Sequence, residues 1–322
     1  MIWLKKYNWA CIGCGDIASD MAKVMVQRGK SFCGVYSRTA KRAEAFADKY
    51  GIEKVYSSAD ELFADESIDV VYIATPHNCH IEYILKAAKS KKHILCEKAI
   101  TVSFDELEKA VETAKENGVI LAEAQTIYHM PVFDEVFSHI KNGSLGKLKM
   151  LDVNFGTKKE YDITNRFFSP ELAGGAMLDI GVYALSFVRF FLSENASEIK
   201  SIATLSPTGV DDNAIILLSN IKNEMANVKL SFSAKLPRTA IASFEKGYVE
   251  FDNFNRATRA NIIFNDGRAP IEIRCSEDIY PLHYEVEDME TALSGGENKM
   301  KLDLTLDVME IMTKLRNEWG AK

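Results

Sequence analysis

The sequence predicts an α/β protein in which a doubly wound parallel sheet is followed by an α+β domain with a large, mainly antiparallel, open sheet. Three observations lead to this fold class. Apolar runs alternate with helix-like segments up to about residue 120, a glycine-rich turn follows the first of those runs, and many short β-rich runs separated by turn residues follow residue 123.

The first part of the chain is expected to contain parallel strands that are buried on both faces. The run IDVVYIAT at 68–75 is apolar without alternation, which is typical of such strands, and Ser58 and Ser103 precede helices with acidic first turns. Predicted strands are 7–14, 31–37, 54–58, 68–75, 92–98 and 119–124, and predicted helices are 16–29, 39–50, 58–65, 79–90 and 103–118.

The second part is expected to be a sheet with helices on one face. Predicted strands are 147–156, 199–206, 213–219, 225–233, 239–246, 247–252, 260–265 and 269–275, and predicted helical segments are 131–141, 174–192, 283–294 and 302–318. We therefore divide the chain into domains 1–122 and 123–322, with the option that the terminal helix packs back on the first domain.

Composition excludes several classes of partner. A net charge of −7 gives no electrostatic reason to expect nucleic acid or an anionic membrane surface. We find no apolar run long enough for a bilayer and no secretory signal in residues 1–15. Six scattered cysteines are expected to be reduced thiols in a cytoplasmic protein. Cys11 with Cys14, and His77 with Cys79 and His80, lack a second ligand pair, so we predict no metal site.

The turn after the first strand predicts a dinucleotide-binding, Rossmann-type domain. Gly13, Gly15 and Ala18 form G-x-G-x-x-A, in which the first glycine permits the tight turn and the second admits a pyrophosphate. The helix start at Asp16 and Ile17 then offers backbone N–H groups to the phosphates. The alternative is that the glycines only close a turn.

The end of the second strand favours NADP(H) over NAD(H). Sites for NAD place an acidic residue there to bind the ribose 2′-hydroxyl, whereas this strand ends in Ser37 and Arg38, whose hydroxyl and guanidinium suit a 2′-phosphate. The alternative is that Arg38 only opens a solvated helix face with Lys41 and Arg42.

Four motifs together resemble the glucose–fructose oxidoreductase/inositol dehydrogenase/rhizopine-catabolism (Gfo/Idh/MocA) oxidoreductases. They are the glycine turn at 13–18, ATPHNCH at 74–80, CEKAI at 96–100 and GGAMLDIGVY at 174–183. The resemblance covers nearly the whole chain. It implies a nicotinamide-dependent dehydrogenase or reductase that acts on CH–OH groups, and a C-terminal sheet that often forms the subunit interface.

The resemblance also implies site residues. The catalytic lysine falls on Lys98, and the other two polar positions fall on Asp179 and Tyr183. Tyrosine at 183, where many members carry histidine, resembles the branch of dimeric dihydrodiol dehydrogenases, D-xylose dehydrogenases and glucose–fructose oxidoreductase. Expected cofactor contacts beyond the glycine turn and the second strand are Ala74, Thr75, Pro76, His77, His80 and Glu97.

Two positions depart from the family pattern. Ala99 replaces the proline after the lysine, so either this peptide bond is trans or the loop is strained to keep Lys98 in place. Tyr128 or His129 replaces an arginine in the loop after Glu123-Ala124, which makes Tyr128 a candidate substrate contact together with Asn165 and Arg166. A solvated loop would explain Asn165 and Arg166 nearly as well.

Two proton-transfer schemes are open. A free phenol, with a pKa of about 10, is a poor base at neutral pH, but a neighbouring ammonium favours the phenolate. We prefer Tyr183 as the acid/base with Lys98 assisting, and Asp179 orienting Lys98 or binding a substrate hydroxyl; alternatively Lys98 itself moves the proton. Without such roles Lys98 would be a solvated lysine, Asp179 a helix cap and Tyr183 a core aromatic.

The sequence thus predicts an NADP(H)-preferring oxidoreductase for a sugar, polyol or trans-dihydrodiol, and a homodimer or dimer of dimers that pairs through the C-terminal sheet. Two alternatives stay open. One is a non-catalytic regulator that senses a dinucleotide or sugar, and the other is an oxidoreductase that holds its cofactor permanently.

Overall fold

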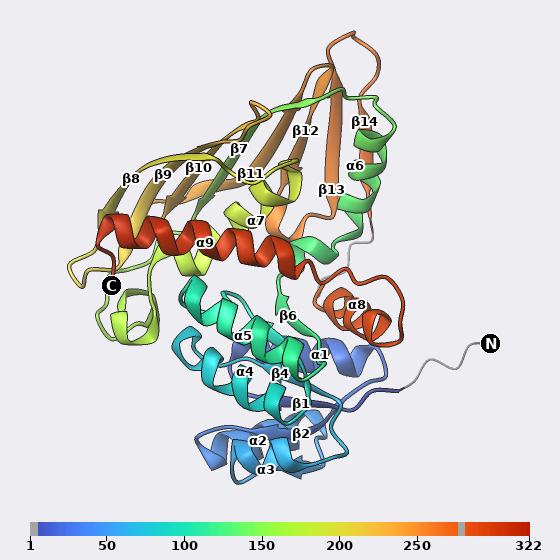
Figure 1. Ribbon diagram of the computed structural model, residues 1–322, viewed down its shortest axis with the longest axis vertical. Helices are drawn as coiled ribbons and strands as arrows, with labels where there is room; N and C mark the ends of the chain where they lie inside the picture. Colours follow the sequence, from blue (N-terminus) through green and yellow to red (C-terminus); the bar gives the residue numbers. More distant parts are fainter. Residues whose placement is uncertain (1–5, 276–280) are drawn as a thin grey trace. The chain divides into compact units, whose positions relative to one another are not determined.

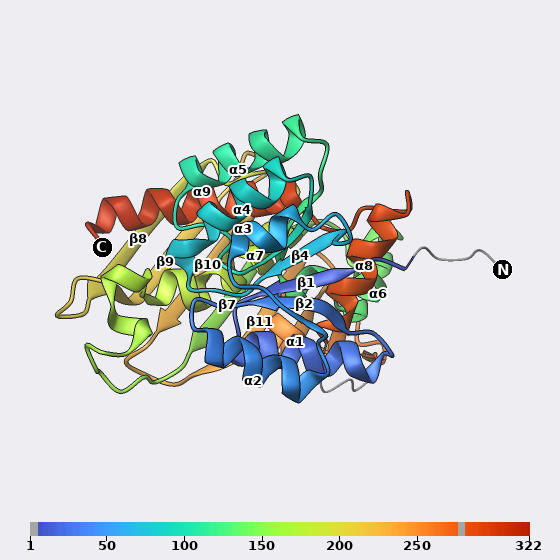
Figure 2. The same ribbon diagram turned by 90° about the horizontal axis from the view of Figure 1, so that it is seen from below.

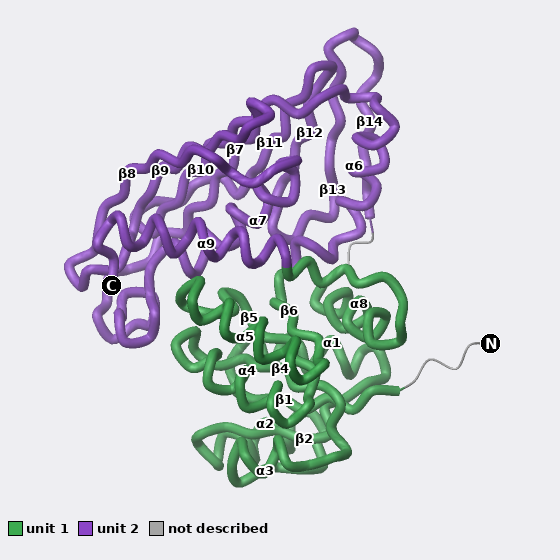
Figure 3. The backbone as a smooth tube through the Cα atoms, viewed as in Figure 1, with its two compact units in different colours: residues 1–125, 280–302 green, residues 126–279, 303–322 purple. Residues whose placement is uncertain are grey.

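The computed structural model describes residues 6–275 and 281–322. The first residues of the N-terminal segment considered above for a secretory signal lie outside the described residues. The chain divides into two compact units, one made of residues 1–125 and 280–302 and the other of residues 126–279 and 303–322 (Figure 3). Each unit is described by itself.

The first unit contains the expected parallel sheet, with strand order β3-β2-β1-β4-β5-β6. Every neighbouring pair in it is parallel. Helices α1 and α2 lie on one face, and α4 and α5 on the other (Figure 2). The strands are β1 (Trp9–Ile12), β2 (Phe32–Tyr36), β3 (Lys54–Val55), β4 (Val70–Ile73), β5 (His93–Glu97) and β6 (Leu121–Ala124). The helices are α1 (Asp16–Gln27), α2 (Ala40–Tyr50), α3 (Ala59–Ala64), α4 (His80–Lys89), α5 (Phe104–Glu116) and α8 (His283–Leu293).

Local signals explain these elements. All four residues of β1 and of β4 are buried, in keeping with apolar runs that do not alternate. The Ser58 and Ser103 side chains accept hydrogen bonds from the Glu61 and Glu106 amides, as expected of N-caps. Strand β3 is shorter than its predicted range, because its two residues are exposed at the sheet edge.

The proposed boundary after residue 122 differs from the observed division, because residues 280–302 belong to the first unit. Val286, Met289 and Met300 pack in one hydrophobic core with Trp9. The Trp9 indole also donates to Glu290 at 3.1 Å. These contacts join segments about 280 positions apart, so no local pattern revealed them.

The second unit is an open, mainly antiparallel sheet of eight strands in the order β14-β13-β12-β11-β7-β10-β9-β8, with β7 and β10 as its one parallel pair. Its strands are β7 (Leu148–Gly156), β8 (Glu198–Leu205), β9 (Asp211–Ser219), β10 (Met225–Ser231), β11 (Leu236–Phe244), β12 (Gly247–Asp252), β13 (Arg259–Phe264) and β14 (Ile271–Arg274). Helices α6 (Pro131–Lys141), α7 (Val182–Phe191) and α9 (Leu302–Trp319) cover one face (Figure 1). The expected fold class is confirmed.

Aromatic packing joins α6 and α7 to the sheet. Phe133 of α6 stacks on Phe251 of β12 with 5.1 Å between ring centroids, and Phe187 of α7 stands edge-on to Phe251 at 5.4 Å. Residues 170–191 contain an 18-residue window that is long and apolar enough for a membrane span, but 89% of this window is buried. Their apolar character is therefore explained by this core.

The terminal helix, α9, is anchored within the second unit. The Trp319 indole of α9 donates to Ser201 of β8 at 2.8 Å, and Asp307 of α9 accepts from Arg189 of α7 at 2.6 Å. These contacts lie within the second unit, to which residues 303–322 belong.

Candidate active site

The glycine turn joins β1 to α1 as the motif requires. Gly13 has a φ of +105°, and a Cβ atom there would lie 2.2 Å from the Ala74 carbonyl oxygen. Gly15 differs, because a Cβ atom at this position would meet no heavy atom within 4 Å. Ala18 is fully buried, as a small residue at the third motif position should be.

The residues present fit a dinucleotide. Helix α1 begins after Gly15 without a side-chain cap, so the backbone N–H groups at Asp16 and Ile17 remain available to a phosphate. The open space beside Gly15 lies at the same turn. The glycines therefore do more than close a turn.

The end of β2 lies against this turn. The Gly13 amide donates to the Tyr36 carbonyl at 2.9 Å, and Arg38 is exposed two residues further on. Burial raises the pKa of the Cys14 thiol to about 11, while a hydrogen bond with Ser37 and the charge of Arg42 lower it. Ser37 is thus next to the glycine turn. Cys14 is predominantly a thiol at neutral pH, which does not favour a thiolate site.

The loop at 74–80 connects the glycine turn to Lys98. Its first residue, Ala74, donates its amide to Ile12 at 2.8 Å. At its other end the His77 ring contacts the Lys98 carbonyl at 3.1 Å, and the His80 ring contacts the carbonyls of Thr75 and Ala99 at 2.8 and 3.1 Å. His77 and His80 therefore fix loop backbones. Burial lowers the pKa of His80, although hydrogen bonds with the Thr75, Ala99 and Ile100 backbone raise it.

Lys98 follows β5, and buried groups of the neighbouring strands hold the backbone on either side of it. Tyr72 of β4 donates its hydroxyl to Glu97 at 2.5 Å. The Lys98–Ala99 peptide bond is cis, which excludes the trans alternative. Glu123 of β6 accepts from the Ile100 amide at 3.1 Å. The sequence analysis did not assign this role to Glu123, which is buried. An acidic residue within an otherwise apolar strand could have indicated it.

The Thr75 hydroxyl is a further pointer to a ligand. Its oxygen is buried and has no hydrogen-bond partner in the part of the chain that the structure describes. Pro76 precedes the short 3₁₀ helix at His77–Cys79. A hydroxyl in this setting can bind a polar group of a dinucleotide at the carboxyl end of the parallel sheet.

Asp179 and Tyr183 lie in the second unit on one continuous helical segment. Asp179 falls within a π-helical stretch, Met177–Gly181, and Tyr183 within the first turn of α7. Asp179 forms an ion pair with Arg166 at 3.5 Å, and its side chain is 14% exposed. π-Helical turns often mark functional sites.

The predicted substrate residues differ in their surroundings. Arg166 reaches Asp179, whereas the Asn165 side chain accepts from the Phe167 amide and so shapes a turn. Tyr128 is buried, and its ring stands edge-on to Phe190 at 5.2 Å, which gives it a role in the core.

Buried Asp211 holds the start of the helical segment. Its carboxylate accepts from the Met177 amide at 2.6 Å, and a Cβ atom at Gly175 would lie 2.4 Å from its other oxygen. Burial raises the pKa of Asp211 to about 6, although the Met177 amide and Arg316 of α9 lower it. Sequence reasoning missed Asp211, because an acidic pair at the start of a strand resembles a solvated turn.

No group of three or more histidine, cysteine or acidic side chains suited to a metal ion occurs among residues 6–275 and 281–322. Cys11 and Cys14 are free thiols, and His80 is engaged by backbone carbonyls.

The parallel sheet, the glycine turn and the second domain define a two-domain oxidoreductase with a nicotinamide dinucleotide site. Residues 7–125 match the oxidoreductase family with the NAD-binding Rossmann fold, and residues 133–250 match the GFO/IDH/MocA C-terminal domain. The chain belongs to the Gfo/Idh/MocA oxidoreductase family, as the sequence motifs indicated.

Characterised relatives cover most of the chain. A trans-1,2-dihydrobenzene-1,2-diol dehydrogenase of Mus musculus is 32% identical over 249 residues, or 76% of this chain and 74% of the relative. The NADP(+)-dependent scyllo-inositol 2-dehydrogenase IolU of Bacillus subtilis (strain 168) is 30% identical over 298 residues, or 89% and 88%.

Solved structures share the fold. The aldose-aldose oxidoreductase of Caulobacter crescentus superimposes with a TM-score of 0.87 at 20% identity, covering 98% of both chains. KijD10, a 3-ketoreductase from Actinomadura kijaniata solved with NADP and TDP-benzene, gives 0.85 at 21% identity, covering 97% of this chain and 98% of its own.

Proposed function

We propose that this protein is an NADP(H)-dependent oxidoreductase that interconverts a hydroxyl and a carbonyl group on a sugar, a polyol or a vicinal diol. The observation that carries the proposal is the loop at 74–80, which contacts the glycine turn at one end and the Lys98–Ala99 backbone at the other. It supports a dinucleotide site with a positioned lysine beside it.

Several residues fit the cofactor. The N–H groups at the start of α1 suit the pyrophosphate, the Thr75 hydroxyl suits a ribose or amide group, and Ser37 with Arg38 suits a 2′-phosphate. Bound nicotinamide accepts or gives a hydride. The relative IolU carries NADP(+) in its name, which agrees with the proposed preference.

The protein supplies the proton chemistry. We assign the acid/base role to Tyr183, with the Lys98 ammonium favouring its phenolate and stabilising a developing alkoxide. Asp179 binds a substrate hydroxyl or orients Lys98, and its ion pair with Arg166 helps to hold the carboxylate in place. The alternative, in which Lys98 transfers the proton directly, predicts a different effect of Tyr183→Phe.

The test of this function is turnover. Purified protein is mixed with NADP+ or NAD+ and a panel of aldoses, inositols and vicinal diols, and the near-ultraviolet absorbance of the reduced cofactor is followed. We expect reduction of NADP+ with at least one compound. The reverse reaction is tested with NADPH and the matching carbonyl compounds. Tight cofactor binding without turnover in either direction would reject the proposal.

We also propose that the protein forms homodimers through the open face of its second sheet. An apolar strip on this face, defined by Met150, Ile202, Ile215, Leu217 and Met225, is 46–76% exposed. Ile202 and Ile215 are direct cross-strand partners. Single exposed apolar residues are common on protein surfaces, whereas a contiguous strip of them is typical of an interface core.

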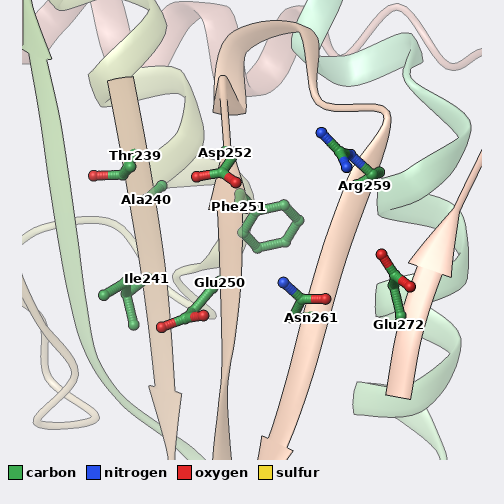
Figure 4. Close-up of a pocket in the computed structure, with 9 residues that line it drawn as sticks. All are labelled: Thr239, Ala240, Ile241, Glu250, Phe251, Asp252, Arg259, Asn261 and Glu272. Atoms are coloured by element: carbon green, nitrogen blue, oxygen red, sulfur yellow. The ribbon is translucent and has the colours of Figure 1, made fainter. Parts of the chain in front are cut away.

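The other half of this face is polar. A hollow of about 230 Å³ over β11–β14 is lined by side chains such as Glu250, Asp252, Arg259 and Glu272 (Figure 4). Acidic and basic groups next to an apolar strip suit the rim of an interface. The hollow contains none of the residues assigned to catalysis.

A further inference from the structure

Tyr183 has an arginine next to it that no motif indicated. The Tyr183 ring lies 6.2 Å from that of Phe155 on β7, and the guanidinium carbon of Arg238 on β11 stands 4.6 Å above the centre of the Phe155 ring. Asn253 accepts a hydrogen bond from Arg238 at 3.0 Å. The Arg238 guanidinium is thus held by one hydrogen bond and one aromatic ring, and Arg238 remains exposed.

A second arginine lies on the same side. Arg256 ends the short 3₁₀ helix Phe254–Arg256, and Phe254 stands edge-on to Phe155 at 5.9 Å. The Nε atom of Arg256 and the side-chain oxygen of Asn255 are buried with no hydrogen-bond partner among the described residues. Asn255 is only 5% exposed. Of these two atoms, the Arg256 Nε is a donor without an acceptor, and a donor is what an anionic oxygen group requires.

The charges of these groups act on one another. Burial lowers the pKa of Arg238, Tyr183 raises it and Arg256 lowers it. Tyr183, Arg238 and Arg256 are thus within electrostatic range, and an anion among them would relieve the repulsion between the arginines.

The protein itself supplies no such anion in the part of the chain that the structure describes. Arg166, Arg189 and Arg268 each have a carboxylate within 4 Å, whereas no ion pair is formed there by Arg238 or Arg256. The neighbouring acid, Asp252, is exposed and does not pair with either. In a chain with a net charge of −7, two adjacent unpaired arginines require an explanation.

We propose that Arg238 and Arg256 form a subsite for an anionic oxygen group, a carboxylate or a phosphate ester, on the substrate that is oxidised at Tyr183. This inference rests on the proposed function and narrows its substrate class to sugar acids or sugar phosphates. A guanidinium presents paired N–H donors that match both groups. A neutral diol would leave both charges unmatched.

The test compares compounds that differ in charge alone. The turnover of glucose is compared with that of glucuronate and glucose 6-phosphate, with NADP+ as oxidant, in the wild type and in Arg238→Gln, Arg256→Gln and Arg268→Gln. Arg268 pairs with Asp266 in a hairpin turn and serves as the matched control. The comparison of glucuronate with glucose 6-phosphate distinguishes the two kinds of anion.

We expect one of the anionic compounds to exceed glucose in kcat/KM by ~10-fold or more, from the strength of charge-assisted hydrogen bonds. Arg238→Gln and Arg256→Gln should each bring the kcat/KM of the anionic compound down to that of glucose measured with the same variant, and Arg268→Gln should keep the advantage. Equal values for charged and neutral compounds in the wild type would overturn the inference.

Binding separates this inference from the proposed function. If no compound is turned over, titration calorimetry of the NADP+-bound protein with glucose, glucuronate and glucose 6-phosphate still tests the subsite. Tighter binding of an anion than of glucose, lost in Arg238→Gln, supports the subsite even if the oxidoreductase proposal fails. Equal or undetectable binding of all three rejects it.

Discussion

The carboxylate of Asp211 accepts a hydrogen bond of 2.6 Å from the backbone amide of Met177. Asp211 begins β9, and Met177 begins the π-helical stretch that carries Asp179. This bond fixes the start of the segment that presents Asp179 and Tyr183. The charge of Arg316 on α9 acts on the same carboxylate and lowers its pKa.

Asp211→Asn should change the pH dependence of stability. Burial raises the pKa of Asp211 to about 6, above the ~3.9 of an unfolded aspartate. Its contribution is therefore largest below the unfolded pKa and is lost as pH rises through 6. The unfolding free energy of the wild type minus that of the variant should fall by about 2 kcal/mol between pH 4 and 7.5.

Urea unfolding at several pH values measures this difference. Asparagine keeps an oxygen for the Met177 amide, so the variant should fold. If the unfolding free energies of the wild type and the variant differ by the same amount at every pH from 4 to 7.5, the pKa of Asp211 is not raised.

Gly13→Ala should affect stability, whereas Gly15→Ala should affect cofactor binding. A Cβ atom at Gly13 clashes with the Ala74 carbonyl, so Gly13→Ala should lower the unfolding free energy by about 2 kcal/mol or more. A Cβ atom at Gly15 meets no protein atom, so Gly15→Ala should keep the stability and weaken NADP+ binding by ~10-fold or more. Thermal unfolding with and without NADP+ tests both, and unchanged affinity in Gly15→Ala would be inconsistent with a pyrophosphate at this turn.

Arg38→Gln should reduce the preference for NADP+ over NAD+. The exposed guanidinium at the end of β2 is the group we assign to the 2′-phosphate, and its loss should weaken NADP+ by ~10-fold or more with little effect on NAD+. Fluorescence titration with both cofactors measures the ratio. Lys41→Gln, on the adjacent exposed helix face, is the matched control; an equal loss in both variants would point to general charge attraction.

Leu217→Glu should convert dimers into monomers. Leu217 is 52% exposed in the apolar strip, and a carboxylate there would be desolvated in a paired sheet face. Light scattering after gel filtration gives the mass, with Val26→Glu as a control at an exposed apolar residue of α1. A monomeric wild type, or a dimer that persists in Leu217→Glu, would exclude this interface.

Local patterns predicted the parallel sheet, the order of most elements and the glycine turn, because buried strands, helix caps and left-handed glycines depend on nearby residues. The place of residues 280–302 could not be predicted locally, since it depends on the hydrophobic core that Val286 and Met289 share with Trp9. Arg238 could not be placed locally either, because LPRTA reads as the solvated start of a strand, and only the pairing of β7 with β11 brings Arg238 to Phe155.

We propose that Lys98 and Tyr183 carry out proton transfer for a nicotinamide-dependent reaction. The most direct test is the rate of NADP+ reduction by Lys98→Met and Tyr183→Phe, with NADP+ affinity measured on the same samples. We predict that each variant loses turnover by ~100-fold or more and keeps wild-type affinity. Tyr183→Phe at full rate would give the acid/base role to Lys98, and full activity in both variants would exclude both residues from proton transfer.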